Sequence, residues 1–116
     1  MTKTVVTAEP KSVAEQREED DRFLNGGYEY LLGNKYRKGV QVPKDYQKAF
    51  THYLASAQLG NPNGQYNAGV CYRHGRGVDA DFMMAYYWVG RAAEKGQGQA
   101  IRLMPELEAR FNKQYA

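Results

Sequence analysis

The chain has 116 residues, of which 42% are hydrophobic and 25% charged, and its formal net charge is +3. This composition is typical of a globular protein and argues against wholesale disorder, and the length predicts one domain. The longest apolar runs fall far short of the roughly 18 residues that a membrane-spanning helix needs, and a single cysteine excludes an internal disulfide. The first residues also lack the apolar segment of a signal peptide, so we expect a cytoplasmic protein.

The N-terminal part is predicted to contain a flexible segment followed by a polar helix. Residues 1–11 have no helical pattern, and we expect them to be flexible. Ser12 and Glu15 form the S-x-x-E pattern of a capping box, which predicts a helix of about ten residues from there. This helix carries the acidic run 18–21. We expect it to cap the open end of the domain.

Four helices are predicted after it, over residues 26–38, 45–59, 62–74 and 81–95. Asn61-Pro62 is a helix start, and Asp45 and Asp81 are placed to cap the second and fourth helices. A glycine follows each helix, where a left-handed residue ends a helix at low cost. These glycines are Gly39, Gly60, Gly75 and Gly96.

The C-terminal residues predict two more short helices. One is expected to begin near Gln97 and to be interrupted by Pro105. The other covers 106–115, with Leu107 and Phe111 on one face at i, i+4 spacing. These residues are expected to form a C-terminal cap over 97–116.

The sequence repeats with a period of 36 residues. A shift of this length superposes ten positions of matched chemistry in order and without gaps. The pairs are Tyr30/Tyr66, Gly33/Gly69, Tyr36/Tyr72, Gly39/Gly75, Val42/Val78, Asp45/Asp81, Tyr46/Phe82, Ala49/Ala85, Ala57/Ala93 and Gly60/Gly96. We therefore expect a single repeat domain over 12–116, with repeats at 25–60 and 61–96.

Two matched glycines, Gly33 and Gly69, lie inside the first helix of each repeat, where glycine costs about 1 kcal/mol relative to alanine. We expect the missing side chain to let the second helix cross closely. Small residues on the second helices would face them. These are Ala49, Ala57, Ala85, Ala92 and Ala93.

The repeat unit resembles that of the Sel-one-like repeat (SLR) family, a relative of the tetratricopeptide repeat (TPR). The matching residues in the second repeat run from Gly69 to Val78 and continue with Asp81, Ala85, Trp88, Ala92, Ala93 and Gly96. In the first repeat they are Leu32, Gly33, Tyr36, Gly39, Val42, Asp45, Lys48, Ala49, Tyr53, Ala57 and Gly60. The departures from the family pattern are Gln41, His52, Met84 and Val89.

The resemblance covers about 28–100 and implies an all-α fold: a short right-handed α/α solenoid, or TPR-like superhelix, of two helix-pair repeats. With the flanking segments, we expect N- and C-terminal capping helices. The resemblance also implies that the first helices line a concave groove and that the protein is an adaptor, scaffold or regulator, as is common in bacteria.

The groove would present a stripe of aromatic and basic residues to a partner protein, because Tyr and Arg dominate interface energetics. The predicted partner-binding residues are Tyr30, Asn34, Arg37, Lys38, Tyr66, Val70, Arg73 and His74. Two alternatives stay open. Tyr30 and Tyr66 could instead pack between the repeats, and Arg37 and Arg73 could be ordinary solvated surface residues.

Few residues could carry catalysis or hold a metal. Cys71 and His74 are two ligands, whereas a zinc site usually has four. An inert thiol near the core and a structural His52 are the simpler interpretations. The loop Gly75-Arg76-Gly77 lacks the strand and the Gly-Lys-Ser/Thr that a phosphate loop needs. We therefore predict no enzyme, no catalytic residue, no metal, no cofactor and no small-molecule substrate.

Charge is unevenly distributed and bears on the partner. Residues 1–25 carry four basic and six acidic side chains, whereas 26–116 carry twelve basic and seven acidic. The basic residues are scattered, which does not favour nucleic-acid binding. We expect this chain to be a small inhibitor, immunity or regulatory protein and its partner to be a protein with an acidic surface. The alternatives are a self-associating scaffold and contact through the acidic N-terminal helix.

Overall fold

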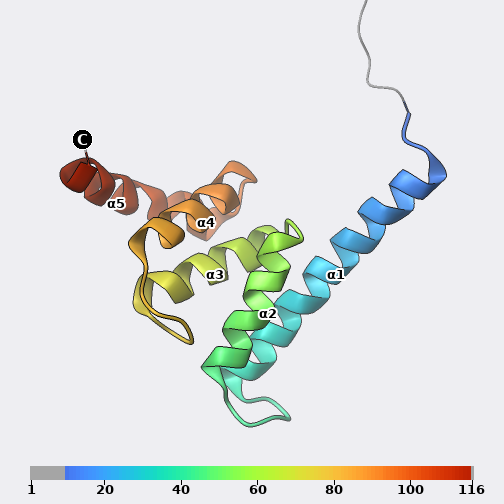
Figure 1. Ribbon diagram of the computed structural model, residues 1–116, viewed down its shortest axis with the longest axis horizontal. Helices are drawn as coiled ribbons and strands as arrows, with labels where there is room; N and C mark the ends of the chain where they lie inside the picture. The colour runs from blue at the N-terminus through green and yellow to red at the C-terminus, as the bar shows by residue number, and fades with distance from the viewer. Residues whose placement is uncertain (1–9, 116) are drawn as a thin grey trace, which may run out of the picture.

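The computed structural model describes residues 10–115, which form five α-helices and no strand. The helices are α1 (Val13–Lys38), α2 (Tyr46–Gln58), α3 (Pro62–His74), α4 (Phe82–Glu94) and α5 (Gly98–Tyr115). Packing is most extensive within the pairs α1–α2 and α3–α4, and α2 packs on α3 to join them (Figure 1). This arrangement confirms the predicted all-α solenoid of helix pairs. No helix in this range is both long and apolar enough to cross a bilayer.

Side-chain caps begin four of the helices where the sequence predicts them. Ser12, Asp45, Asn61 and Asp81 each accept a hydrogen bond from the backbone N–H three residues later, at 3.0–3.1 Å. Each bond satisfies one of the N–H groups that the first turn leaves without a helical partner. The predicted starts of α1 to α4 are therefore confirmed.

The loops that close the two hairpins have the same backbone conformation. Gly39 and Gly75 end α1 and α3 in the left-handed region, with φ of 71° and 66°. Two residues later, Gln41 has φ of 63° where the second repeat has Gly77 at 76°. Gln41 replaces the glycine of the family pattern but adopts the same left-handed conformation, so the loop keeps its shape although φ is strained for a residue with a side chain.

The expected N-terminal helix does not exist as a separate element. It is continuous with the first repeat helix, because α1 runs unbroken from Val13 to Lys38. Gly26 stays helical because it packs closely: a Cβ there would lie 3.2 Å from the Asn61 Cβ, and the Ser56 hydroxyl donates to its carbonyl oxygen at 2.6 Å. Residues 13–25 are exposed, so this extension does not bury the end of the solenoid as we expected.

Pro105 does not divide the C-terminal segment into two helices, contrary to prediction, and α5 continues through it. Proline removes the N–H that would bond to the carbonyl of Ile101. Both residues are exposed, so water can replace that bond, while Ala100 and Leu107 anchor the opposite face at 0% and 3% exposure. The packing of α5 on α4 therefore outweighs the tendency of proline to break a helix.

The predicted close crossing within each helix pair is confirmed, and the expected Ala85 lies at one crossing, where its carbonyl oxygen would be 3.3 Å from a Cβ on Gly69. The nearest side chains at the crossings were not expected. A Cβ on Gly33 would lie 2.5 Å from Cδ1 of Tyr53, and one on Gly69 would lie 2.6 Å from Cγ2 of Val89. The glycines thus make room for a tyrosine and a valine. The alanines Ala49, Ala57, Ala85 and Ala92 are buried nearby.

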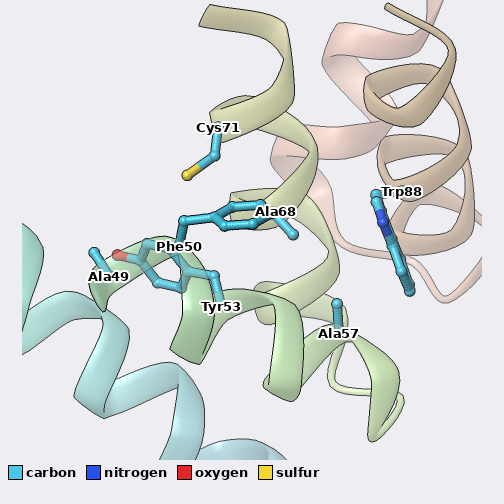
Figure 2. Packing of buried hydrophobic residues seen from close by; sticks show 7 residues of the cluster. All are labelled: Ala49, Phe50, Tyr53, Ala57, Ala68, Cys71 and Trp88. Atoms are coloured by element: carbon cyan, nitrogen blue, oxygen red, sulfur yellow. The ribbon is translucent and has the colours of Figure 1, made fainter. Parts of the chain in front are cut away.

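The core consists of two clusters that meet at α4. Figure 2 shows the first, which joins four residues of α2 and two of α3 to Trp88 of α4. The second joins Val89 and Ala92 of α4 to Ala100 and Leu107 of α5. Adjacent residues of α4, Trp88 and Val89, therefore link the two clusters.

Candidate protein-binding surface

The α1 part of the predicted stripe is tied to a buried tyrosine of α2. The Tyr53 hydroxyl donates to Asn34 Oδ1 at 2.6 Å and accepts from Arg37 Nε at 2.9 Å. Tyr30 packs against the same ring, with centroids 6.2 Å apart. Burial of Tyr53 raises the pKa of its hydroxyl, although the bond from Arg37 acts in the opposite direction. Asn34 and Arg37 thus provide the hydrogen-bond partners of a buried hydroxyl, a role that the sequence analysis did not predict for them.

The α3 part of the stripe is divided among different contacts. Tyr66 packs against the second core cluster, and Val70 is half-buried. Arg73 donates to Glu106 of α5 at 2.6 Å. Among the eight residues only Lys38 and His74, at the ends of α1 and α3, are exposed rather than half-buried. Tyr30 and Tyr66 are both half-buried, but Tyr30 packs on Tyr53 of its own repeat and Tyr66 on residues of α4 and α5.

A basic cluster that the sequence did not indicate surrounds Tyr46 at the start of α2. Lys44 Nζ lies 5.0 Å from the centre of the Tyr46 ring, and the Arg76 guanidinium carbon lies 5.3 Å from it. The two cations come from different repeats. They meet because the loop after α3 lies against α2, so closely that a Cβ on Gly77 would overlap the Tyr46 carbonyl.

The charges of this cluster act on the tyrosine itself. A hydrogen bond from Lys44 lowers the pKa of the Tyr46 hydroxyl, and the positive charges of Lys44, Arg76 and Arg37 lower it further. The ring is exposed, and a shallow depression of about 510 Å³ adjoins it. An exposed aromatic ring between two cations can bind an acidic side chain and pack against its neighbours.

Cys71 and His52, the residues considered above for catalysis, lie in surroundings that do not favour it. Burial raises the pKa of the Cys71 thiol to about 11, with the charges of Arg76 and Arg37 offsetting only part of the shift. The nucleophilic thiolate is therefore scarce at neutral pH. His52 is held by Glu29 at 2.6 Å and stacks on Tyr36 with centroids 5.5 Å apart. Within 10–115 no three His, Cys, Asp or Glu residues are grouped to hold a metal.

A second surface missed by the sequence analysis is apolar. Leu24, Tyr28 and Leu31 of α1 are 64%, 60% and 63% exposed. Their i, i+4, i+7 spacing is typical of a buried helix face. The repeat does not predict this apolar face, because the residues 36 positions later are small or polar. They are Gly60, Gly64 and Asn67.

Comparison with known proteins identifies the repeat and several relatives. The sequence profile of the Sel1 repeat matches residues 28–61 and 62–97. A chitin synthase regulator, SKT5 of Saccharomyces cerevisiae, is 36% identical over 72 residues, which are 62% of this chain and 10% of that protein. The alginate biosynthesis protein AlgK of Azotobacter vinelandii is 31% identical over 88 residues, 76% of this chain and 19% of the relative.

A solved structure extends the similarity to three dimensions. A Sel1 repeat protein from Oxalobacter formigenes superposes with a TM-score of 0.68 and 32% identity, over 71% of this chain and 24% of that one. The chain thus spans a quarter or less of the length of these proteins. What they share with it is the repeat.

Proposed function

This chain belongs to the Sel1 repeat family, whose members mediate protein–protein interactions, and we propose that it is a non-catalytic module that binds an acidic partner protein. In this proposal it acts as a small regulatory or adaptor protein, such as an inhibitor or immunity factor. We keep the cytoplasm as the proposed location, because the chain has a single cysteine and no disulfide framework of the kind found in small secreted domains.

The observation that carries the proposal is the basic cluster around Tyr46. Lys44 and Arg76 are exposed, they come from adjoining repeats, and both lie within 5.3 Å of the centre of one ring. Carboxylates of an acidic partner that approach this ring can pair with these cations. The predicted stripe along α1 and α3 remains a wider footprint, with Lys38 and His74 as its exposed members.

The test compares two double variants that remove the same charge. Lys44→Ala with Arg76→Ala removes the cluster, whereas Arg102→Ala with Lys113→Ala removes two exposed cations of α5. Both should melt near the wild-type temperature, because none of the four side chains is buried. Arg37 is left intact because it bonds to Tyr53 and its loss would also affect stability.

The partner is first captured from the native host and identified by mass spectrometry, and the variants are then titrated against it by calorimetry. Hydrogen bonds to charged groups contribute about 1.5–3 kcal/mol each, so the cluster variant should lose at least that much affinity. The α5 variant should bind as the wild type does. Equal affinity of both variants would contradict the proposed surface.

A further inference from the structure

The exposed apolar residues of α1 line a shallow groove of about 480 Å³. It is lined by Leu24, Tyr28 and Leu31 together with Asn61 of the α2–α3 turn and Asn63 of α3. None of its lining residues is charged, although charged residues make up 25% of the chain. Contiguous exposed apolar surface of this kind marks an interaction site.

A glycine in this groove has no explanation within the chain. Gly27 lies in the interior of α1, where glycine is costly, and a Cβ there would meet nothing within 4 Å. The adjacent Gly26 differs, because a Cβ on it would lie 3.2 Å from the Asn61 Cβ. The open space over Gly27 therefore allows the backbone of another helix to approach α1 closely.

The two ends of α1 carry opposite net charge. Between Val13 and Asn25 the helix carries five acidic and two basic side chains, whereas its last turn carries the basic residues Lys35, Arg37 and Lys38. The helix dipole favours the same order of charges. It does not account for the exposed leucines or for Gly27.

We propose that α1 pairs with α1 of a second copy of this chain, in antiparallel orientation, with the two-fold axis between Gly27 and Tyr28. This register places Leu24 opposite the partner's Leu31 and Tyr28 opposite the partner's Gly27. It also places Asp20 opposite the partner's Lys35, an attractive pair that occurs once on each side of the axis, whereas Arg17 faces the partner's Lys38. Such a contact is self-complementary and closes as a dimer.

Helix geometry and exposure support this pairing. Leu24 and Leu31 are spaced by seven residues, and Tyr28 lies between them at i+4, so the three side chains share one face of α1. The N-terminal half of α1 extends beyond the body formed by the other helices, which leaves room for a partner helix beside it (Figure 1). Lys44 and Arg76 do not belong to α1, so the cluster around Tyr46 is a separate surface.

Sedimentation velocity over a wide range of protein concentration tests the dimer. The wild type should change from monomer to dimer as concentration rises, with weaker association at high salt. Leu24→Glu combined with Leu31→Glu should abolish the dimer while the circular dichroism spectrum is retained, because both residues are exposed. Ile101→Glu, at a 51% exposed position of α5, is the matched control and should leave the dimer unchanged.

Charge reversal tests the register. Asp20→Lys and Lys35→Glu should each raise the dimer dissociation constant, and the variant that carries both should restore it, because the opposite charges then meet again. A wild type that stays monomeric, or a dimer that survives the paired glutamates, would overturn the proposal. So would a doubly reversed variant that associates as weakly as the single ones.

Discussion

At the scale of single residues, two glycines set the distance between the helices of each pair. Gly69 faces Val89, which is fully buried, and a Cβ on Gly69 would also lie 3.0 Å from the Val89 backbone nitrogen. A backbone atom of α4 cannot move aside without shifting the helix. Gly90 in α4 differs, since a Cβ there would find only Met104 Cε at an ordinary 3.8 Å.

Gly69→Ala should therefore lower the free energy of unfolding by about 1–3 kcal/mol, because the added methyl group overpacks the crossing. Gly90→Ala is the matched control, and it should raise stability by up to about 1 kcal/mol through its helix propensity. Urea unfolding followed by circular dichroism measures both. Equal stability of the two variants would mean that α3 and α4 do not cross closely at Gly69.

At the scale of elements, the second helix of each repeat depends on an aspartate that begins it. Asp81 Oδ1 accepts from the Met84 N–H at 3.1 Å, and the backbone N–H of Asp81 itself donates to the Tyr72 carbonyl at 2.9 Å. One residue thus starts α4 and fixes the loop to the end of α3. Asp79, two residues earlier, is also exposed but makes no such cap.

Asp81→Ala should cost about 1 kcal/mol of stability, because the first turn of α4 loses its side-chain acceptor. Asp79→Ala removes the same charge and serves as the control. We expect its melting temperature to match the wild type within error. If both variants melted alike, net charge rather than the cap would be responsible.

At the scale of the whole molecule, α4 connects the two core clusters and α5 completes the second. Leu107 of α5 is 3% exposed and packs in the cluster that contains Val89. Trp88, the neighbour of Val89, belongs to the first cluster and is the single tryptophan of the chain. Its fluorescence therefore reports on a cluster that Leu107 does not join.

Leu107→Ala should destabilise the protein by about 2–5 kcal/mol, through lost burial and the cavity left behind. If the molecule unfolds as one unit, tryptophan fluorescence and circular dichroism should shift to the same lower urea midpoint. Ile101→Ala, at an exposed position of the same helix, should change stability by less than about 0.5 kcal/mol. Separate midpoints for the two signals would show that α5 unfolds independently.

Local sequence alone determined where most helices begin and end. The capping side chains and the glycines after each helix act within a few residues, so their effect can be recognised without a fold. The 36-residue period then implied that equivalent helices stack in the same way. This reasoning also located the crossings at Gly33 and Gly69, because a costly glycine that recurs in a helix needs a packing reason.

Tertiary structure decided what depends on contacts between distant residues. Pro105 remains within α5 because the burial of Ala100 and Leu107 outweighs the cost of the helical hydrogen bond that proline removes. Asn34 and Arg37 are used by the Tyr53 hydroxyl, which lies 16 or more residues away in sequence. Lys44 and Arg76 meet only because a loop of the second repeat packs on α2. Local patterns carry no information about such contacts, since they arise only when the helices pack against one another.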